Sequence, residues 1–421
     1  MNIQNLDQII ENGLCAGCGI CESIAGRNSV EMTLTSDQRL RPQTKSSIQD
    51  SHLEKILEVC PGITITGPKK KQAGPFGTTN KVFGPILSLY RGWATDEGIR
   101  FHAAAGGALT ALGIHLLESK KVDAVLHVQA SSEYPLLTNA LVSTSARQLY
   151  DGAQSRYGPA APLTQVNQLL DDGYVFAVIG KPCDISAIKN LAKVDDRVKD
   201  QIPYTLTMFC GGVPSLKMPV DMARKFGVKA TDLSRFRFRG EGWPGMTHME
   251  TKDGRSFNLT YDESYLNTGA SWTYDSQFRC KICPDAIGEV ADVACPDGWV
   301  IENGKPIHQE APGANIFISR TPNGEKLLRD AKSAGVITLE PFTQKELEIM
   351  HGDHIPRKIF WPARMLGLLL AGKPVIKVKR YRKWKAIIKA GPMLFFGNVN
   401  GAFRRARGQK KVELGFRRSE S

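Results

Sequence analysis

Nine cysteines, gathered in two stretches of the chain, constrain this 421-residue sequence more than any other feature. Four lie within the first 60 residues, and five lie between residues 183 and 295. The N-terminus carries acidic and amide side chains rather than a basic stretch followed by an apolar one, so we expect a cytoplasmic protein without a secretory signal. Thiols in that compartment are seldom paired as disulfides, and two groups of at least four soft ligands predict two metal sites.

The first cysteine group has the spacing of an iron–sulfur site. Cys15, Cys18 and Cys21 form a C-x2-C-x2-C run, and Cys60 follows at a distance with a proline after it. Three thiolates at such intervals can wrap one face of a cubane cluster, and a remote cysteine closes the fourth corner. The spacing therefore predicts one 4Fe-4S cluster in a small ferredoxin-like segment, residues 1–66. Zinc, which also suits C-x2-C pairs, and free thiols stay open as alternatives.

The second cysteine group combines strand ends with a C-x2-C pair. Cys183 and Cys210 fall at the carboxyl ends of two expected strands, and Cys280 and Cys283 lie on a loop further on. Open α/β sheets place their ligands at the carboxyl ends of parallel strands. These four cysteines could close around a second cubane cluster. Cys295 is a fifth thiol that spacing does not assign, and zinc or buried thiols without a metal remain alternatives.

Strand and helix signals alternate through the middle of the chain. They predict an α/β fold, mixed α+β in detail, with a mainly parallel sheet. A Phe/Arg alternation at 235–239, followed by a strand–turn–strand pattern to residue 261, predicts an antiparallel insertion. Residues 67–84 are rich in Gly, Pro and Lys, which is typical of a linker.

Positive charge is concentrated at the C-terminus. Residues 373–421 hold 15 Lys/Arg and two Asp/Glu, whereas residues 1–372 hold 40 of each sign. Three functions compete for this basic tail: contact with a membrane surface at the inner face of the membrane, docking of an acidic electron-transfer partner, and nonspecific nucleic-acid binding. The neutral body argues against a zinc-stabilised nucleic-acid-binding protein. No apolar run reaches the roughly 20 residues of a membrane-spanning helix.

Several motifs together resemble the beta-subunit family of coenzyme F420 hydrogenases and dehydrogenases, whose relatives include 7-hydroxymethyl chlorophyll a reductase and a divinyl chlorophyllide reductase. The motifs are the N-terminal cysteine run and residues 106–112, 122–125, 180–184, 280–283, 289–292 and 298–299. The sequence and the resemblance together divide the chain into four regions. The cysteine run defines the ferredoxin-like segment 1–66, and the charge distribution defines the basic tail 373–421. The resemblance implies a family N-terminal flavin-binding α/β region at 85–160 and a family C-terminal iron–sulfur/flavin domain at 161–372.

The resemblance implies an oxidoreductase that holds FAD and one or two 4Fe-4S clusters. Electrons would pass between a two-electron carrier or small-molecule substrate, coenzyme F420 among them, and one-electron partners such as a ferredoxin or a hydrogenase or dehydrogenase subunit. A flavin suits this exchange because it accepts a hydride and releases electrons singly. Two alternatives stay open: a non-catalytic electron-relay subunit, and a ferredoxin-dependent tetrapyrrole reductase of the chlorophyll type.

Six residues are candidates for binding the flavin: Gly106, Gly107, Thr110, Arg156, Tyr157 and Lys181. The two glycines precede an expected helix, whose N-terminus suits a pyrophosphate. The catalytic residues are unknown from sequence. His102, as a proton donor, and Lys181, as a charge beside a cluster or flavin, are the candidates we retain. The histidines are otherwise scattered, without a triad or a zinc motif.

Overall fold

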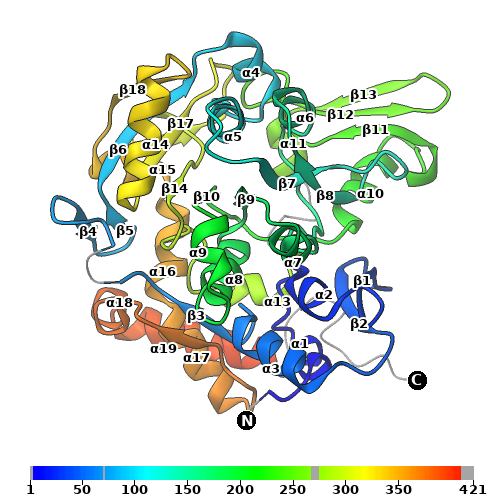
Figure 1. Cartoon of the computed structure of the whole chain (residues 1–421), viewed down its shortest axis with the longest axis vertical. Coiled ribbons are helices and arrows are strands. Elements are labelled where there is room, and N and C mark those ends of the chain that lie inside the picture. The colour runs from blue at the N-terminus through cyan, green and yellow to red at the C-terminus, as the bar shows by residue number, and fades with distance from the viewer. Residues whose placement is uncertain (1–2, 70–71, 267–274, 409–421) are drawn as a thin grey trace.

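An eight-stranded sheet organises the computed structural model, which describes residues 3–69, 72–266 and 275–408. The strand order is β18-β6-β17-β14-β10-β9-β7-β8 (Figure 1). In that order the strands span Ile337–Pro341, Ser88–Ala94, Asn315–Ser319, Val293–Ala294, Tyr204–Thr207, Phe176–Gly180, Ala124–Ala130 and Thr138–Ser143. The α/β class expected from the sequence is thus confirmed at the level of a mixed α/β fold.

The sheet is less parallel than the sequence predicted. The four central strands, β14, β10, β9 and β7, are parallel neighbours. Both flanks are antiparallel: β17, β6 and β18 on one side, and β8 on the other. The reason lies in the connections, since a parallel pair needs a crossover of a dozen or more residues. Only residues 131–137 join β7 to β8, which leaves room for a hairpin alone.

Helices cover both faces of the sheet. α5 (Ala108–Glu118) and α14 (Pro322–Ser333) pack on one face in a hydrophobic cluster with Phe317 and Leu206. α7 (Val166–Asp171) and α8 (Pro182–Leu191) share a second cluster with strand residues of the other face. Shorter helices lie around them: α4 (Glu97–His102), α6 (Ala146–Asp151), α9 (Arg197–Gln201), α15 (Gln344–Met350), η2 (Gly352–His354) and α16 (Ile355–Ile359). A capping box between Thr343 and Glu346 opens α15.

The predicted antiparallel insertion forms a three-stranded sheet beside the main one, at the upper right of Figure 1. Its strands are β11 (Leu233–Arg237), β12 (Thr247–Thr251) and β13 (Ser256–Leu259), with α10 (Lys217–Arg224), η1 (Ala230–Asp232) and α11 (Tyr261–Tyr265) around them. The stretch predicted as a linker contains β4 (Thr78–Asn80), which pairs with β5 (Gly84–Ile86), and its Phe83 is buried. Phe83 packs in a hydrophobic cluster with Ile316 and Ile318 of the main sheet, so the stretch is more than a spacer.

The N-terminal segment and the C-terminal region pack together at the lower end of Figure 1. The segment contains α1 (Leu6–Glu11), α2 (Ile20–Ala25), β1 (Val30–Leu34), β2 (Leu40–Thr44), α3 (Asp50–Val59) and β3 (Thr64–Thr66). Strand β3 pairs in parallel with β19 (Lys377–Lys379). One hydrophobic cluster includes Leu14 of the segment, Phe176 of the main sheet and Tyr381 of the C-terminal region. The three parts therefore share a core.

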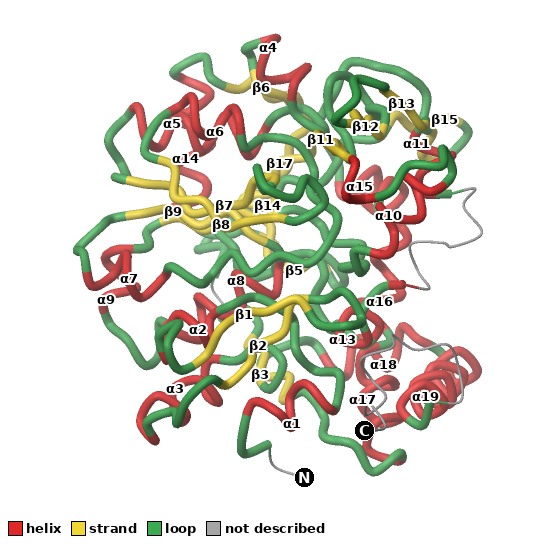
Figure 2. The backbone as a smooth tube through the Cα atoms, turned by 90° about the vertical axis from the view of Figure 1, so that its right-hand side faces the viewer, coloured by secondary structure: helices red, strands yellow, loops and turns green. Residues whose placement is uncertain are grey.

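The described part of the basic region beyond residue 372 forms a strand and two helices that pack against the rest of the chain. After β19 come α18 (Lys383–Ala390) and α19 (Pro392–Ala406), and α19 packs on α17 (Trp361–Leu370) at the lower right of Figure 2. Residues 409–421 of the predicted tail lie outside the described part. Within the described ranges, no helix has both the length and the apolar composition that crossing a bilayer would demand.

Candidate functional site

The first cysteine group converges around one small pocket. Cys15, Cys18, Cys21 and Cys60 all line it. Cys15 and Cys18 stand on the loop before α2, Cys21 in its first turn, and Cys60 at the end of α3. The tight loop depends on Gly17, whose positive φ of 73° favours glycine and whose backbone N–H donates to the Cys15 sulfur at 3.4 Å.

The thiols of this pocket are buried, apart from the half-buried Cys60, and they are close enough to repel one another as thiolates. Burial, followed by the neighbouring charges of Asp184, Cys60 and Cys21, raises the pKa of Cys18 well above its ordinary value. Burial and the proximity of Cys15 raise the pKa of Cys60 to about 11. Such a set of donors is stable as thiolates only with positive charge among them, and iron or zinc ions supply that charge.

The second group draws its four cysteines from three distant segments. Cys183 lies in the first turn of α8, Cys210 follows β10, and Cys280 belongs to α13 (Phe278–Lys281), three residues before Cys283. Burial is the first cause of the raised pKa of Cys183, and the charges of Cys210 and Cys280 contribute further. Burial and the proximity of Cys280 and Cys283 raise the pKa of Cys210 to about 12. The structure thus gathers the four thiols that the sequence grouped.

Cys295, which spacing could not assign, lies apart from these four. It is buried in the cluster of α5 and α14, among side chains such as Leu112 and Phe317. Burial alone raises its pKa, with no neighbouring thiol as a further cause. Its backbone N–H donates to the carbonyl of Thr207 at 2.7 Å, which continues the β10–β14 pairing. Cys295 is therefore a small buried apolar side chain in this structure.

One buried arginine lies between the two cysteine groups. Arg279 is 2% exposed, and its Nη2 donates to the carbonyl of Pro61, next to Cys60, at 3.0 Å. Burial alone lowers the pKa of Arg279, but the proximity of Cys283, Cys183 and Cys280 outweighs it and raises the pKa. The charge of Arg279 also lowers the pKa of Cys60, a smaller effect than burial. No pattern in the sequence had singled out this residue.

Two further side chains join the groups. Gln277, two residues before Arg279, donates from Nε2 to the carbonyl of Ala16 at 3.3 Å. Asp184, next to Cys183, is fully buried, and its charge also reaches Cys18. Asp184 binds Lys181 at 2.8 Å. Lys181, a candidate from the sequence, therefore lies beside the second cysteine group. Burial alone lowers the pKa of Lys181, but the charges of Asp184, Cys183 and Cys210 outweigh burial and raise it.

The glycine candidates lie at the start of α5, against the start of β17. A Cβ on Gly106 would stand 2.8 Å from backbone atoms of Ala314 and Asn315, so the two chains approach closely there. Gly107 is the N-cap of α5 with a φ of 75°, and the following N–H, of Ala108, donates to the side chain of Asn315 at 3.2 Å. Thr110 is half-buried in the first turns of this helix.

Arg156 and Tyr157 are placed elsewhere and are bonded to the protein itself. Arg156 donates to the carbonyls of Pro135, Leu137 and Phe236 at 2.8–3.0 Å, and burial lowers its pKa to about 10. It thereby ties the insertion to the loop before β8. Tyr157 accepts a hydrogen bond from Arg239 at 3.0 Å.

Arg239 is the centre of a buried aromatic cage that the sequence did not reveal either. It is 1% exposed, pairs with Asp297 at 2.9 Å and donates to the carbonyl of Ala104, close to the α5 glycines. Its guanidinium lies 5.1–5.5 Å from the ring centres of Trp243, Tyr261 and Trp299. The Phe/Arg alternation was the available signal, but it indicated only a strand.

His102 ends α4 close to this cage. Its Nδ1 lies 2.5 Å from the Glu241 carboxylate, its ring stacks on Tyr150, and its buried Nε2 has no hydrogen-bond partner within the described part of the chain. A hydrogen bond from Nδ1 to a carboxylate fixes the tautomer and leaves Nε2 as the basic nitrogen. This geometry suits a group that holds or accepts a proton.

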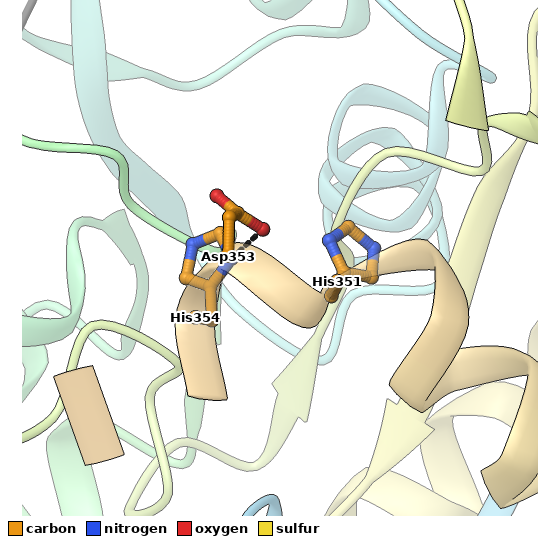
Figure 3. Close-up of side chains that lie close together, drawn as sticks. All are labelled: His351, Asp353 and His354. Atoms are coloured by element: carbon orange, nitrogen blue, oxygen red, sulfur yellow. Dashed lines mark hydrogen bonds and ion pairs between the residues drawn. The ribbon is translucent and has the colours of Figure 1, made fainter. Parts of the chain in front are cut away.

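The histidines are not all scattered, contrary to the sequence expectation. His351, Asp353 and His354 offer ligand atoms that all lie within 4.8 Å of one another (Figure 3). Both rings are already bonded: His351 Nε2 to the carbonyl of Asp297 at 3.0 Å, and His354 Nδ1 to Asp353 at 2.9 Å. Both imidazoles contact Phe209, next to Cys210. The cluster thus connects the second cysteine group with the cage of Arg239.

Known proteins of one family match the region that carries this geometry. The family model for the N-terminal part of the coenzyme F420 hydrogenase/dehydrogenase beta subunit matches residues 89–168, and the model for the C-terminal part matches residues 175–345. The chain belongs to the coenzyme F420 hydrogenase/dehydrogenase beta-subunit family. The second cysteine group, Arg279 and Arg239 lie within the matched regions, whereas the first cysteine group and the C-terminal helices lie outside them.

Individual members of the F420 beta-subunit family are distant relatives. An F420-dependent formate dehydrogenase subunit beta from Methanocaldococcus jannaschii is 29% identical over 61% of this chain and 62% of its own length. A coenzyme F420-dependent sulfite reductase from the same organism is 24% identical over 86% of this chain and 55% of its own length. The chain thus spans less than two thirds of either relative.

A solved structure supports the fold of this F420 beta-subunit family member. A chain of the F420-reducing [NiFe] hydrogenase complex from Methanosarcina barkeri superposes with a TM-score of 0.53 and 16% identity, over 69% of this chain and 95% of that one. At this identity the likeness concerns the fold alone. Together with the family models, it supports the mixed α/β fold described above.

Proposed function

We propose that this chain is an iron–sulfur flavoprotein that passes electrons between a two-electron carrier and a one-electron partner. One observation carries the proposal: two groups of four cysteines, from distant parts of the chain, flank a single buried arginine. The F420-dependent formate dehydrogenase and sulfite reductase among the relatives favour coenzyme F420 or a similar reducible small molecule as the two-electron carrier. The one-electron partner would be a ferredoxin or a subunit of a hydrogenase or dehydrogenase complex.

The donor sets of both groups fit 4Fe-4S clusters. Each offers four mutually close thiols, buried or half-buried, which matches the four-thiolate ligation of a cubane cluster. Cys15, Cys18, Cys21 and Cys60 would hold one cluster, and Cys183, Cys210, Cys280 and Cys283 the other. When bound, the clusters carry single electrons, and FAD converts between a hydride and two single electrons.

The side chains of this chain would orient the bound cofactors, shield them and set the charge around them. Arg279 holds a positive charge between the two cysteine groups, and Lys181 with Asp184 places an ion pair beside the second. Gly107, Thr110 and Lys181 are the residues we assign to FAD. Arg156 is better assigned to structure, because its guanidinium is bonded to protein carbonyls. His102, with Glu241 at Nδ1, would take up the proton that accompanies hydride transfer.

The composition of the anaerobically purified full chain tests this proposal. We expect about eight iron atoms, about eight sulfides and about one FAD per chain, with visible absorbance that bleaches when reduced coenzyme F420 is added. Clusters without FAD would favour the electron-relay role instead. Zinc in place of iron, without flavin, would contradict the proposal.

Substitution of single cysteines tests the ligand assignment. Cys183→Ala should remove about half of the iron, because one cluster of roughly four irons loses a ligand. Cys295→Ala is the matched control, since Cys295 is also buried but lies among apolar side chains. It should leave iron content unchanged. Equal iron in wild type and Cys183→Ala, or loss of iron in Cys295→Ala, would overturn the assignment. Iron and sulfide assays with electron paramagnetic resonance provide the measurement.

A further inference from the structure

The helices α18 and α19 expose an unusual share of the molecule's large apolar side chains. Of the fourteen that are exposed among the described residues, seven lie between residues 369 and 396. They are Leu369, Leu370, Trp384, Ile388, Met393, Leu394 and Phe396. Ile388 is 81% exposed and Met393 is 82% exposed. We call the part of this set on α18 and α19, residues 384–396, the C-terminal apolar surface.

These two helices bury their small side chains and expose their large ones. The buried residues of α18 include Ala386 and Ala390, and those of α19 are Val399, Ala402 and Ala406. The contact with α17 is correspondingly close, since a Cβ on Gly367 would stand 2.4 Å from the Val399 carbonyl oxygen. A helix that merely completes a globular core turns its large apolar side chains inward. This inverted arrangement therefore points to a second apolar environment outside the molecule.

The stretch of sequence that carries the C-terminal apolar surface has charges of one sign. The sequence has no Asp or Glu between Asp353 and Glu413. Exposed basic side chains in this region are Lys377, Lys379, Arg380, Lys385, Lys389, Arg404 and Arg407. Lys385 and Lys389 lie on α18 next to the exposed Trp384 and Ile388. The complementary surface must therefore be both anionic and able to accept apolar side chains.

An anionic lipid surface meets both conditions better than a protein does. Cores of protein interfaces are depleted in Lys, whereas α18 alternates Lys with exposed Trp and Ile. Helices that lie in the membrane interface combine Lys and Arg with Trp, Phe and Leu, and bury the apolar side chains at the boundary of headgroups and acyl chains. No described helix could span the bilayer, so the contact would be a surface contact.

We propose that the C-terminal apolar surface docks on an anionic phospholipid membrane. Trp384, Ile388, Met393 and Phe396 enter the interfacial layer, while Lys385 and Lys389 contact lipid phosphates. The proposal is independent of the clusters and the flavin, because none of the candidate ligands lies on these helices.

Vesicle flotation with the purified full chain tests this docking. The protein should float with vesicles of equal parts phosphatidylglycerol and phosphatidylcholine, but not with phosphatidylcholine alone, and high salt should weaken the binding. The double variant Ile388→Ser/Met393→Ser should bind at least about tenfold more weakly. Reversal of Lys385 and Lys389 to Glu should cost about fivefold or more per lysine. Phe76→Ser, which removes a 91% exposed side chain far along the chain, is the matched control and should bind as wild type does.

Three outcomes would overturn the proposal. They are the absence of binding to anionic vesicles, binding that the α18 and α19 variants leave unchanged, and an equal loss of binding in Phe76→Ser. Protection of α18 from proteolysis by an acidic protein partner, without protection by vesicles, would assign the surface to a protein instead. Far-ultraviolet circular dichroism of each variant establishes that a loss of binding is not a loss of folding.

Discussion

At the residue scale, Arg279 is the side chain that most distinguishes this site from a pair of separate metal centres. It contacts the loop of one cysteine group through the Pro61 carbonyl, and it faces three thiols of the other. A positive charge near a cluster stabilises the reduced, more negative state, and burial strengthens the effect by lowering the local dielectric. Arg279 therefore sets the reduction potentials of both proposed clusters, with the greater effect on the second.

Arg279→Gln should lower both potentials. The expected shift is on the order of 100 mV for the second cluster, since a unit charge several ångströms away is worth a few kcal/mol at an effective dielectric near 20. The shift at the first cluster should be smaller, because Arg279 contacts that group through the Pro61 carbonyl and has only a small effect on the pKa of Cys60. Potentiometric titration followed by electron paramagnetic resonance measures both values. Arg279→Lys keeps the charge and should stay near wild type; unchanged potentials in Arg279→Gln would refute the electrostatic role.

The structure brings together the thiols that spacing had grouped, but the sequence did not indicate the side chains around them. Spacing grouped the four thiols of each set, because a C-x2-C element and a strand end each constrain where a side chain can go. Arg279, one residue from Cys280, looks like an ordinary basic surface residue in the sequence. Only tertiary packing against the N-terminal segment buries it. Cys295 also follows a strand, yet β14 turns it toward the α5 face, and no local pattern distinguishes it from Cys210.

At the scale of elements, glycine decides how closely α17 and α19 approach. Gly367→Ala should destabilise the protein by roughly 1–3 kcal/mol, because its methyl group would overlap the Val399 carbonyl and push α19 away. Gly397→Ala is the control on the partner helix: nothing lies within 4 Å of its Cβ, so it should be neutral or stabilise by up to about 1 kcal/mol. Urea unfolding and hydrogen exchange of α19 measure the two effects. Equal stability of both variants would contradict this packing.

Local sequence patterns indicated where elements lie, but they did not indicate the direction in which neighbouring strands run. The Phe/Arg alternation at 235–239 and the strand–turn–strand pattern to residue 261 lie where the structure has β11, β12 and β13. The sequence predicted a mainly parallel sheet because strands and helices alternate. β6, β17 and β18 pair antiparallel across more than 200 residues of sequence, and no local pattern carries that information.

At the scale of the whole molecule, a buried carboxylate joins the C-terminal region to the body. Glu289 is fully buried and pairs with Lys358 of α16 and with Arg382, which precedes α18, each at 2.6 Å. Burial alone raises the pKa of Glu289, but Lys358 and Arg382 outweigh it, so the net shift is downward. This contribution to stability is complete above the ordinary carboxyl pKa and is lost as the pH falls through the lowered value.

Glu289→Gln should destabilise the chain by about 3–5 kcal/mol, since it removes the charge that pairs with the buried Lys358 and the half-buried Arg382. The acid sensitivity of unfolding should also decrease. Glu340→Gln is the control, because the pair of Glu340 with Arg91 is exposed and worth at most about 1 kcal/mol. Urea midpoints measured across acidic and neutral pH separate the two variants. A midpoint for Glu289→Gln equal to that of Glu340→Gln would show that the pair does not hold the regions together.

The pairing of β3 with β19 has a consequence for how the protein is made. About 310 residues separate the end of β3 from the start of β19, so at a synthesis rate of about 5–20 residues per second the nascent N-terminal segment waits roughly 15–60 s for its partner strand. During that interval the ribosome holds a chain whose first four thiols are not yet enclosed by the later segments. The time needed for translation therefore gives a metal-delivery factor an interval in which it can reach these four thiols before the later segments enclose them.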